Sequence, residues 1–228
     1  MIISFISFLL TVSAFLLGKF IAQKAKGSAL LSPPVIAITV VVTVLLIFGI
    51  SYKDYFEGAR WIHYLLGPAT VSFALPLYHQ LQTLRTHLRA ILVSLVVGCS
   101  IGVLSAVYTG WIFQVAPEIA ISLAPKSVTT PIAMAISEQI GGVAELTVFF
   151  VIFTGIFGAI MAPTLFRVFR IQSPEAKGFA LGLSAHGLGT YQAFQMGEAA
   201  GAFASLGMAL NGIATALFIE FLKVLFPG

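Results

Sequence analysis

Long apolar runs, separated by short polar or basic segments, follow one another along the whole chain. Most of them contain about 20 residues, the length at which an α-helix crosses the hydrocarbon core of a bilayer. This pattern predicts an all-α integral membrane protein with six to eight hydrophobic helical segments in one transmembrane domain, residues 1–228. The runs cover residues 2–22, 34–50, 61–78, 90–113, 118–140, 144–166, 178–196 and 202–225.

The predicted domain has three parts. Residues 1–33 form a first span and a basic loop, 34–114 a first half and 115–228 a second half. The first run has no basic start and no A-x-A-like cleavage site after it, so we expect a retained span rather than a signal peptide. The second half is expected to contain broken helices near residues 123–137 and 183–196, with internal repeats.

Basic residues in the loops indicate the topology. The positive-inside rule places the loops near Lys24 and Arg85 in the cytoplasm, and the polar loop predicted at residues 51–60 outside, with the N-terminus. The basic loop near Arg170 joins the cytoplasmic loops only if residues 123–137 are re-entrant or broken, because two full crossings would place it outside. We therefore expect a re-entrant or broken helix at this stretch.

One polar stretch, LAPKSVTTPIAMAIS, interrupts the apolar sequence at residues 123–137. Its Lys126 needs a partner, water or a ligand, because an ammonium at bilayer depth costs about 2.5–3.5 kcal/mol. Pro125 and Pro131 each remove an amide donor and predict a broken helix. Backbone groups freed in this way must be satisfied by protein or water. The nearby hydroxyls are those of Ser127, Thr129 and Thr130.

Similar interrupted stretches recur along the chain. LGPATVS at residues 66–72 resembles LAPKSVT at 123–129, and LSAHGLGT at 183–190 places His186 at the position of Lys126. Repeats that carry Gly- or Pro-interrupted helices at corresponding places indicate a transporter site near the bilayer midplane. The alternative is a chance match between short Gly/Pro/Ser-rich membrane segments.

The residues at these breaks form the candidate site. A lysine and the amides at a helix start attract an anion, hydroxyls donate hydrogen bonds, and glycines allow close approach of the backbone. The candidate substrate-binding residues are Lys126, Ser127, Thr129, Thr130, His186, Gly187, Gly189, Thr190, Thr70 and Ser72. The candidate proton carriers are His186, Glu138 and Glu198, and the predicted structural breaks are Gly67, Pro68, Pro125 and Pro131.

Each candidate also has a purely structural alternative. Lys126 would anchor at the membrane interface with its ammonium in water. His186 would be a packed histidine bonded to a backbone carbonyl, and Thr70 and Ser72 would bond to their own helix. The two glutamates would be helix caps or loop residues.

Composition limits the classes of function. Hydrophobic residues make up 59% of the chain and charged residues only 9%, which argues against a soluble domain. The net charge of +4 comes from basic residues at segment ends, a pattern that favours lipid headgroups over nucleic acid. The single Cys99 excludes a disulfide framework. No metal, nucleotide or dinucleotide motif is present, and adjacent Lys126 and Ser127 do not face each other on a helix. We expect no enzyme, metal or cofactor.

Several motifs also carry a family resemblance. APKSVTTPIAM at residues 124–134, EQIGG at 138–142, TGIFGA at 154–159 and SAHGLGT at 184–190 resemble the LrgB family of bacterial membrane proteins. The resemblance covers nearly the whole chain from about residue 34. One departure is Tyr191, an aromatic residue where the family's SHxxGTA run has a small one.

The resemblance implies two functions. Family members are described as holin- or antiholin-like modulators of autolysis that act beside a smaller LrgA-type partner. A plastid glycolate/glycerate translocator and bacterial pyruvate-uptake relatives imply transport of small monocarboxylates. We expect a monocarboxylate transporter that works by alternating access with proton coupling; the alternative is a holin/antiholin-like pore or scaffold that modulates murein hydrolase activity. The expected setting is the bacterial cytoplasmic (inner) membrane, as a multi-pass protein. The expected partners are a small organic anion, the lipid bilayer, an LrgA-type protein and further copies of the chain.

Overall fold

The computed structural model describes residues 2–24, 31–65, 68, 71–72 and 74–225, which form helices and loops without strands. The chain divides into two compact units, Met1–Ala74 and Leu75–Gly228. The predicted all-α architecture is confirmed.

Three helices of the first unit are described over their length, and α1 packs against both α2 and α3. Their core contains Ala14, Val41, Tyr55 and Ala59. The helices are α1 (Ile2–Lys24), α2 (Pro33–Phe48) and α3 (Tyr52–Tyr64).

Helix α3 corrects the prediction of a polar loop at residues 51–60. The hydroxyl of Ser51 accepts a hydrogen bond from the amide of Asp54 at 3.2 Å, as an N-cap does. Tyr55 and Ala59 then place apolar groups four residues apart on one buried face, while the charged residues point outward. The polar composition of this segment concealed an amphipathic helix.

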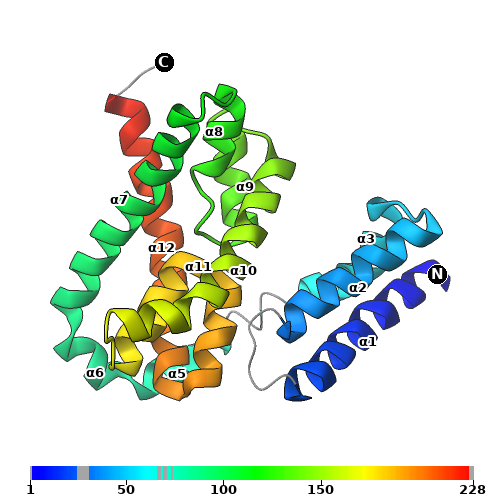
Figure 1. Cartoon of the computed structure of the whole chain (residues 1–228), viewed down its shortest axis with the longest axis horizontal. Coiled ribbons are helices and arrows are strands. Elements are labelled where there is room, and N and C mark those ends of the chain that lie inside the picture. Colours follow the sequence, from blue (N-terminus) through cyan, green and yellow to red (C-terminus); the bar gives the residue numbers. More distant parts are fainter. Residues whose placement is uncertain (1, 25–30, 66–67, 69–70, 73, 226–228) are drawn as a thin grey trace. The chain divides into compact units, whose positions relative to one another are not determined.

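The second unit contains the remaining helices (Figure 1). Within it, α11 packs against α10 and α12, and α7 packs against α8 and α12. The helices are α5 (Ala74–His79), α6 (Leu81–Thr86), α7 (Leu88–Ile112), α8 (Pro117–Leu123), α9 (Thr130–Gln139), α10 (Ala144–Val168), α11 (Pro174–Met196) and α12 (Glu198–Leu225).

Among the described residues, four helices are long and apolar enough to cross a membrane: Phe5–Lys24, Leu88–Ile112, Ala144–Val168 and Glu198–Lys223. This is fewer than the six to eight segments predicted. Two of the predicted segments, 118–140 and 178–196, contain non-helical backbone at residues 124–129 and 185–186, within the stretches where broken helices were expected. Helix α2 is a shorter apolar helix of 16 residues.

The first interruption, residues 124–129, is called here the Lys126 break. Ser122 precedes it and Ser137 follows it, yet both contact one residue of α10. The Thr147 hydroxyl lies 3.0 Å from the Ser122 carbonyl oxygen and 2.7 Å from the Ser137 hydroxyl. The chain therefore turns back on itself between α8 and α9.

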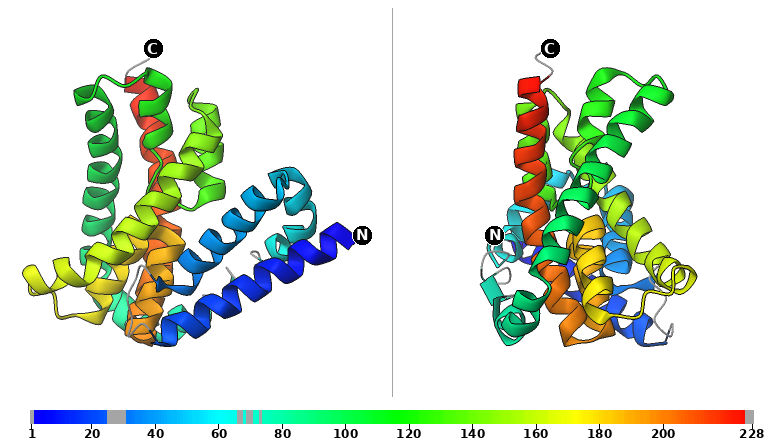
Figure 2. Two further views of the ribbon diagram at one scale, coloured as in Figure 1. Left: turned by 45° about the vertical axis from the view of Figure 1, so that its right-hand side comes forward. Right: turned by 90° about the vertical axis from the view of Figure 1, so that its left-hand side faces the viewer.

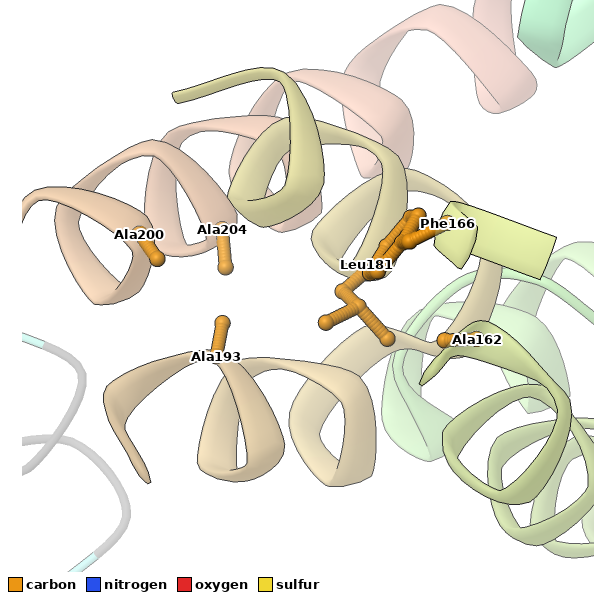
Figure 3. Close-up of a cluster of buried hydrophobic side chains, with 6 residues drawn as sticks. All are labelled: Ala162, Phe166, Leu181, Ala193, Ala200 and Ala204. Atoms are coloured by element: carbon orange, nitrogen blue, oxygen red, sulfur yellow. The ribbon is translucent and has the colours of Figure 1, made fainter. Parts of the chain in front are cut away.

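The second interruption, at Ala185 and His186, is called here the His186 break. His186 has φ 41° and ψ −128°, far from helical values. A Cβ atom built on Gly189 would lie only 2.3 Å from the carbonyl oxygen of Leu181, so the second half of α11 folds back on the first. Figure 3 shows the result, with one apolar cluster drawing residues from both halves of α11. The cluster contains Leu181 and Ala193 of α11, Ala162 and Phe166 of α10, and Ala200 and Ala204 of α12.

The two folded-back segments lie at opposite ends of the second unit. Figures 1 and 2 show α8 and α9 beside the beginning of α10, whereas α11 lies toward the other end of that helix. The contacts agree with this view, because Thr147 at the start of α10 bonds across the first break and Phe166 near its end packs on Leu181. Each break is thus directed toward the middle of the unit.

Candidate functional site

Lys126 extends its ammonium group to the middle of a membrane-length helix. Its Nζ atom donates a hydrogen bond to the carbonyl oxygen of Gly102, near the centre of α7, at 3.1 Å. The side chain is half-buried. Within the part of the chain that the structure describes, no carboxylate forms an ion pair with it. An ammonium has three donors, so two remain for water or an anion.

Three hydroxyls surround this lysine in the sequence, and each belongs to a half-buried residue. Thr129 occupies the N-cap position of α9, but its side chain makes no capping bond. Among the described residues, Ser127, Thr129 and Thr130 have no hydrogen bond from their hydroxyls. A cation and several available donors therefore lie within five consecutive residues, 126–130, at the Lys126 break and the start of α9.

His186 has a different environment, because its side chain is only 6% exposed and its ring is already bonded. Its Nε2 atom lies 2.9 Å from the carbonyl oxygen of Val151 in α10. The absence of a side chain at Gly155 makes room for the ring, since a Cβ there would lie 2.6 Å from its Cε1 atom. This geometry matches the packed histidine of the structural alternative.

The residues after His186 divide into two kinds. Gly187 is exposed, and a Cβ added there would meet no atom within 4 Å. Gly189 is needed for the fold of α11, because it faces the Leu181 carbonyl. The Thr190 hydroxyl donates to the carbonyl oxygen of His186 at 2.8 Å, which leaves it satisfied within its own helix.

Asn211 joins the two breaks, and sequence reasoning missed it. Its side-chain amide, near the middle of α12, donates to the carbonyl oxygens of Ser127 at 3.2 Å and Leu183 at 2.8 Å. Val151 also contacts both breaks. Its carbonyl oxygen is hydrogen-bonded to His186, and its side chain packs in one cluster with Val128 of the Lys126 break. One signal was available, because Asn211 is the only asparagine in the sequence and lies within an apolar run.

The other predicted site residues lie elsewhere. Glu138 and Glu198 are exposed, and Glu198 pairs with His79 at 3.1 Å. Ser72 and Pro68 are exposed and belong to the first unit. Thr70 and Gly67 lie outside the described residues. Of the predicted breaks in the second unit, Pro125 is buried at the Lys126 break and Pro131 lies in the first turn of α9.

This arrangement is suited to a small anion rather than to a metal ion. A lysine, hydroxyls and the first amides of α9 all donate hydrogen bonds, and apolar helices around them strengthen polar contacts by excluding water. Within the described ranges, no group of three His, Cys, Asp or Glu residues stands close enough to hold a metal.

Membrane-length helices and a lysine site deep among them define the class, an integral membrane protein with polar groups inside its apolar fold. The chain belongs to the LrgB-like family, whose model matches residues 11–225. It is 34% identical over 218 residues to the holin-like protein CidB of Staphylococcus aureus, covering 96% of this chain and 95% of that one. It is also 34% identical over 220 residues to the antiholin-like protein LrgB of Bacillus subtilis, covering 96% and 94%. No solved structure matches the chain.

Proposed function

We propose that the protein is a holin-like or antiholin-like component of the bacterial cytoplasmic membrane that modulates murein hydrolase activity and autolysis. The names of two relatives that align over nearly their whole length support this function. The working unit would include an LrgA-type membrane protein or further copies of the chain.

One observation favours a second function, the passage of small monocarboxylates such as glycolate, glycerate, pyruvate or lactate. Lys126 carries a positive charge at the middle of α7, with two donors unused and three free hydroxyls beside it in the sequence. The ammonium would pair with the carboxylate, and a hydroxyl would bond the 2-oxygen of the substrate. Gly187, with open space at its Cα, would leave room for the ligand.

The arrangement of the breaks supports alternating access. The pair α8–α9 is followed by the long helix α10, and the folded α11 is followed by the long helix α12. These two sets approach from opposite ends (Figures 1 and 2). Oppositely oriented repeats with broken helices that meet near the midplane are typical of secondary transporters. In this proposal the internal similarity of the sequence reflects such a repeat.

Proton coupling belongs to the same proposal. The His186 ring, whose Nε2 atom faces the Val151 carbonyl, would carry one proton, and Glu198 would exchange a proton with the neighbouring His79. Glu138, exposed at the end of α9, would exchange protons with water. No catalytic step is proposed for any of them.

Uptake by purified protein in liposomes tests both functions. The proposed carrier takes up labelled glycolate, pyruvate or lactate saturably, and a proton gradient drives it. Lys126→Ala removes the site charge, and losing a hydrogen bond to a charged group costs about 1.5–3 kcal/mol, so uptake below saturation falls roughly 10- to 100-fold.

The matched control is Lys223→Ala, which removes an exposed lysine whose ion-pair partner among the described residues is Glu220. It should leave uptake unchanged. Equal uptake by the two variants would refute the role of Lys126. A leak that depends on solute size and ignores Lys126 would instead establish the holin-like pore.

A further inference from the structure

One amide group holds both breaks of the second unit. Asn211 is 1% exposed, and its Nδ2 atom donates to one carbonyl on each break, those of Ser127 and Leu183. A primary amide carries two hydrogens, so both are in use. The oxygen of the same amide accepts a hydrogen bond from the Thr215 hydroxyl at 3.3 Å, which orients the group.

Both carbonyls need a donor from outside their own segment. The residue four positions after Ser127 is Pro131, which has no amide hydrogen, and the chain is extended at Thr129 before α9 begins. Leu183 lies two residues before Ala185, and the non-helical Ala185 and His186 stand between its carbonyl and Gly187, whose amide would bond it in a regular helix. In an apolar surrounding such carbonyls must be satisfied by other parts of the protein.

We propose that Asn211 is a positioning residue that couples the Lys126 break to the His186 break. The amide is planar and rigid, so a shift of either carbonyl breaks one hydrogen bond or turns the amide and disturbs the other. Movement of the Lys126 break is thereby transmitted to the His186 break and Gly187, and movement of the His186 break is transmitted to the Lys126 break. The structural coupling stands independently of the substrate; only its use during transport rests on the proposed passage of anions.

Cysteine accessibility at the two breaks tests this coupling without a ligand. Cys99→Ser removes the native thiol, and single cysteines at Thr129→Cys and Gly187→Cys report on the two breaks through their rates of alkylation by N-ethylmaleimide. Asn211→Leu keeps a similar volume and removes both donors. We expect it to raise the rate at both positions by about three- to tenfold, the effect of losing two interhelical hydrogen bonds in a membrane protein.

Ser205→Ala is the matched control, because its buried hydroxyl bonds the Gly201 carbonyl of the same helix and no other group in the described part of the chain. It should change neither rate. Asn211→Ala serves where the leucine variant does not fold; it too removes both donors and should raise both rates. A change at one break alone, or at neither, overturns the coupling.

The ligand arm separates this proposal from the transport proposal. In protein that retains Asn211, glycolate should slow alkylation at both Thr129→Cys and Gly187→Cys. Because the ligand would also lie beside Gly187, both effects should persist in Asn211→Leu, but each should be smaller once the two breaks no longer move together. Joint loosening of the breaks without any effect of glycolate would contradict glycolate passage and leave the coupling intact. Glycolate effects of undiminished size at both breaks in Asn211→Leu would contradict the coupling alone.

Discussion

The packing of α11 on α12 predicts opposite effects for one substitution at two glycines of the same helix. Gly182 faces the backbone of α12, and a Cβ there would lie 1.9 Å from the carbonyl oxygen of Ala204. Gly187 faces open space. The perturbation is Gly→Ala at each position, which adds one methyl group and the same gain in helix propensity.

The magnitude follows from two competing terms. Replacing glycine by alanine inside a helix stabilises it by up to about 1 kcal/mol. At Gly182 the contact is with backbone, so no rotamer change relieves it, and the two helices must move apart. Overpacking of this kind costs about 1–3 kcal/mol, and separating the helices also weakens the small-residue interface of α11 with α12, so destabilisation wins. At Gly187 the added methyl group meets no atom, so only the stabilising gain in helix propensity is expected.

Thermal unfolding of the purified protein in detergent measures the difference. At about 2–4 °C per kcal/mol for a chain of this size, Gly182→Ala should lower Tm by roughly 2–8 °C, and Gly187→Ala should leave it unchanged or raise it by up to about 4 °C. Equal Tm values for Gly182→Ala and the unsubstituted protein would refute the close approach of α11 and α12.

Two further predictions concern hydroxyls. Thr147→Val should lower the free energy of unfolding by about 1–3 kcal/mol, because it leaves buried partners on both sides of the Lys126 break unsatisfied; Thr109→Val, whose exposed hydroxyl bonds only its own helix, should change it by less than about 0.5 kcal/mol. Thermal unfolding of both variants checks this, and equal losses would contradict it. Ser173→Ala should cost about 1 kcal/mol at neutral pH by removing the N-cap of α11. The Ser173 hydroxyl also donates to the Glu175 carboxylate and lowers the pKa of that carboxyl from its ordinary 4.5. The part of the stabilisation that comes from this second bond is present above the ordinary pKa and is lost as the pH falls through the lowered one, whereas the N-cap bond does not titrate. The stability difference between the two proteins should therefore shrink between about pH 5 and pH 3, and a difference that grows on acidification would contradict it.

Some of the candidate site was visible in the local sequence. Lys126 stands between two prolines in an apolar run, and both the cost of its charge and the missing amide donors can be read from neighbouring residues. The hydroxyl donors near it, those of Ser127, Thr129 and Thr130, are also visible in the same stretch of sequence. The roles of His186 and Thr190 were less visible, because the ring bonds a carbonyl 35 residues away and the hydroxyl is used inside its own helix.

The sequence by itself determined the all-α membrane class and the family, because the apolar runs and motifs are local properties of the chain. It did not reveal α3, because the buried face of this helix is defined by its packing on α1. It also did not give the number of membrane-length helices, because that number depends on where the broken segments turn back. Only the tertiary structure decided the partners of Asn211, which lie 84 and 28 residues away in the sequence. Carbonyls left free by proline or by non-helical backbone must find donors wherever the fold brings them, and no local pattern specifies that place.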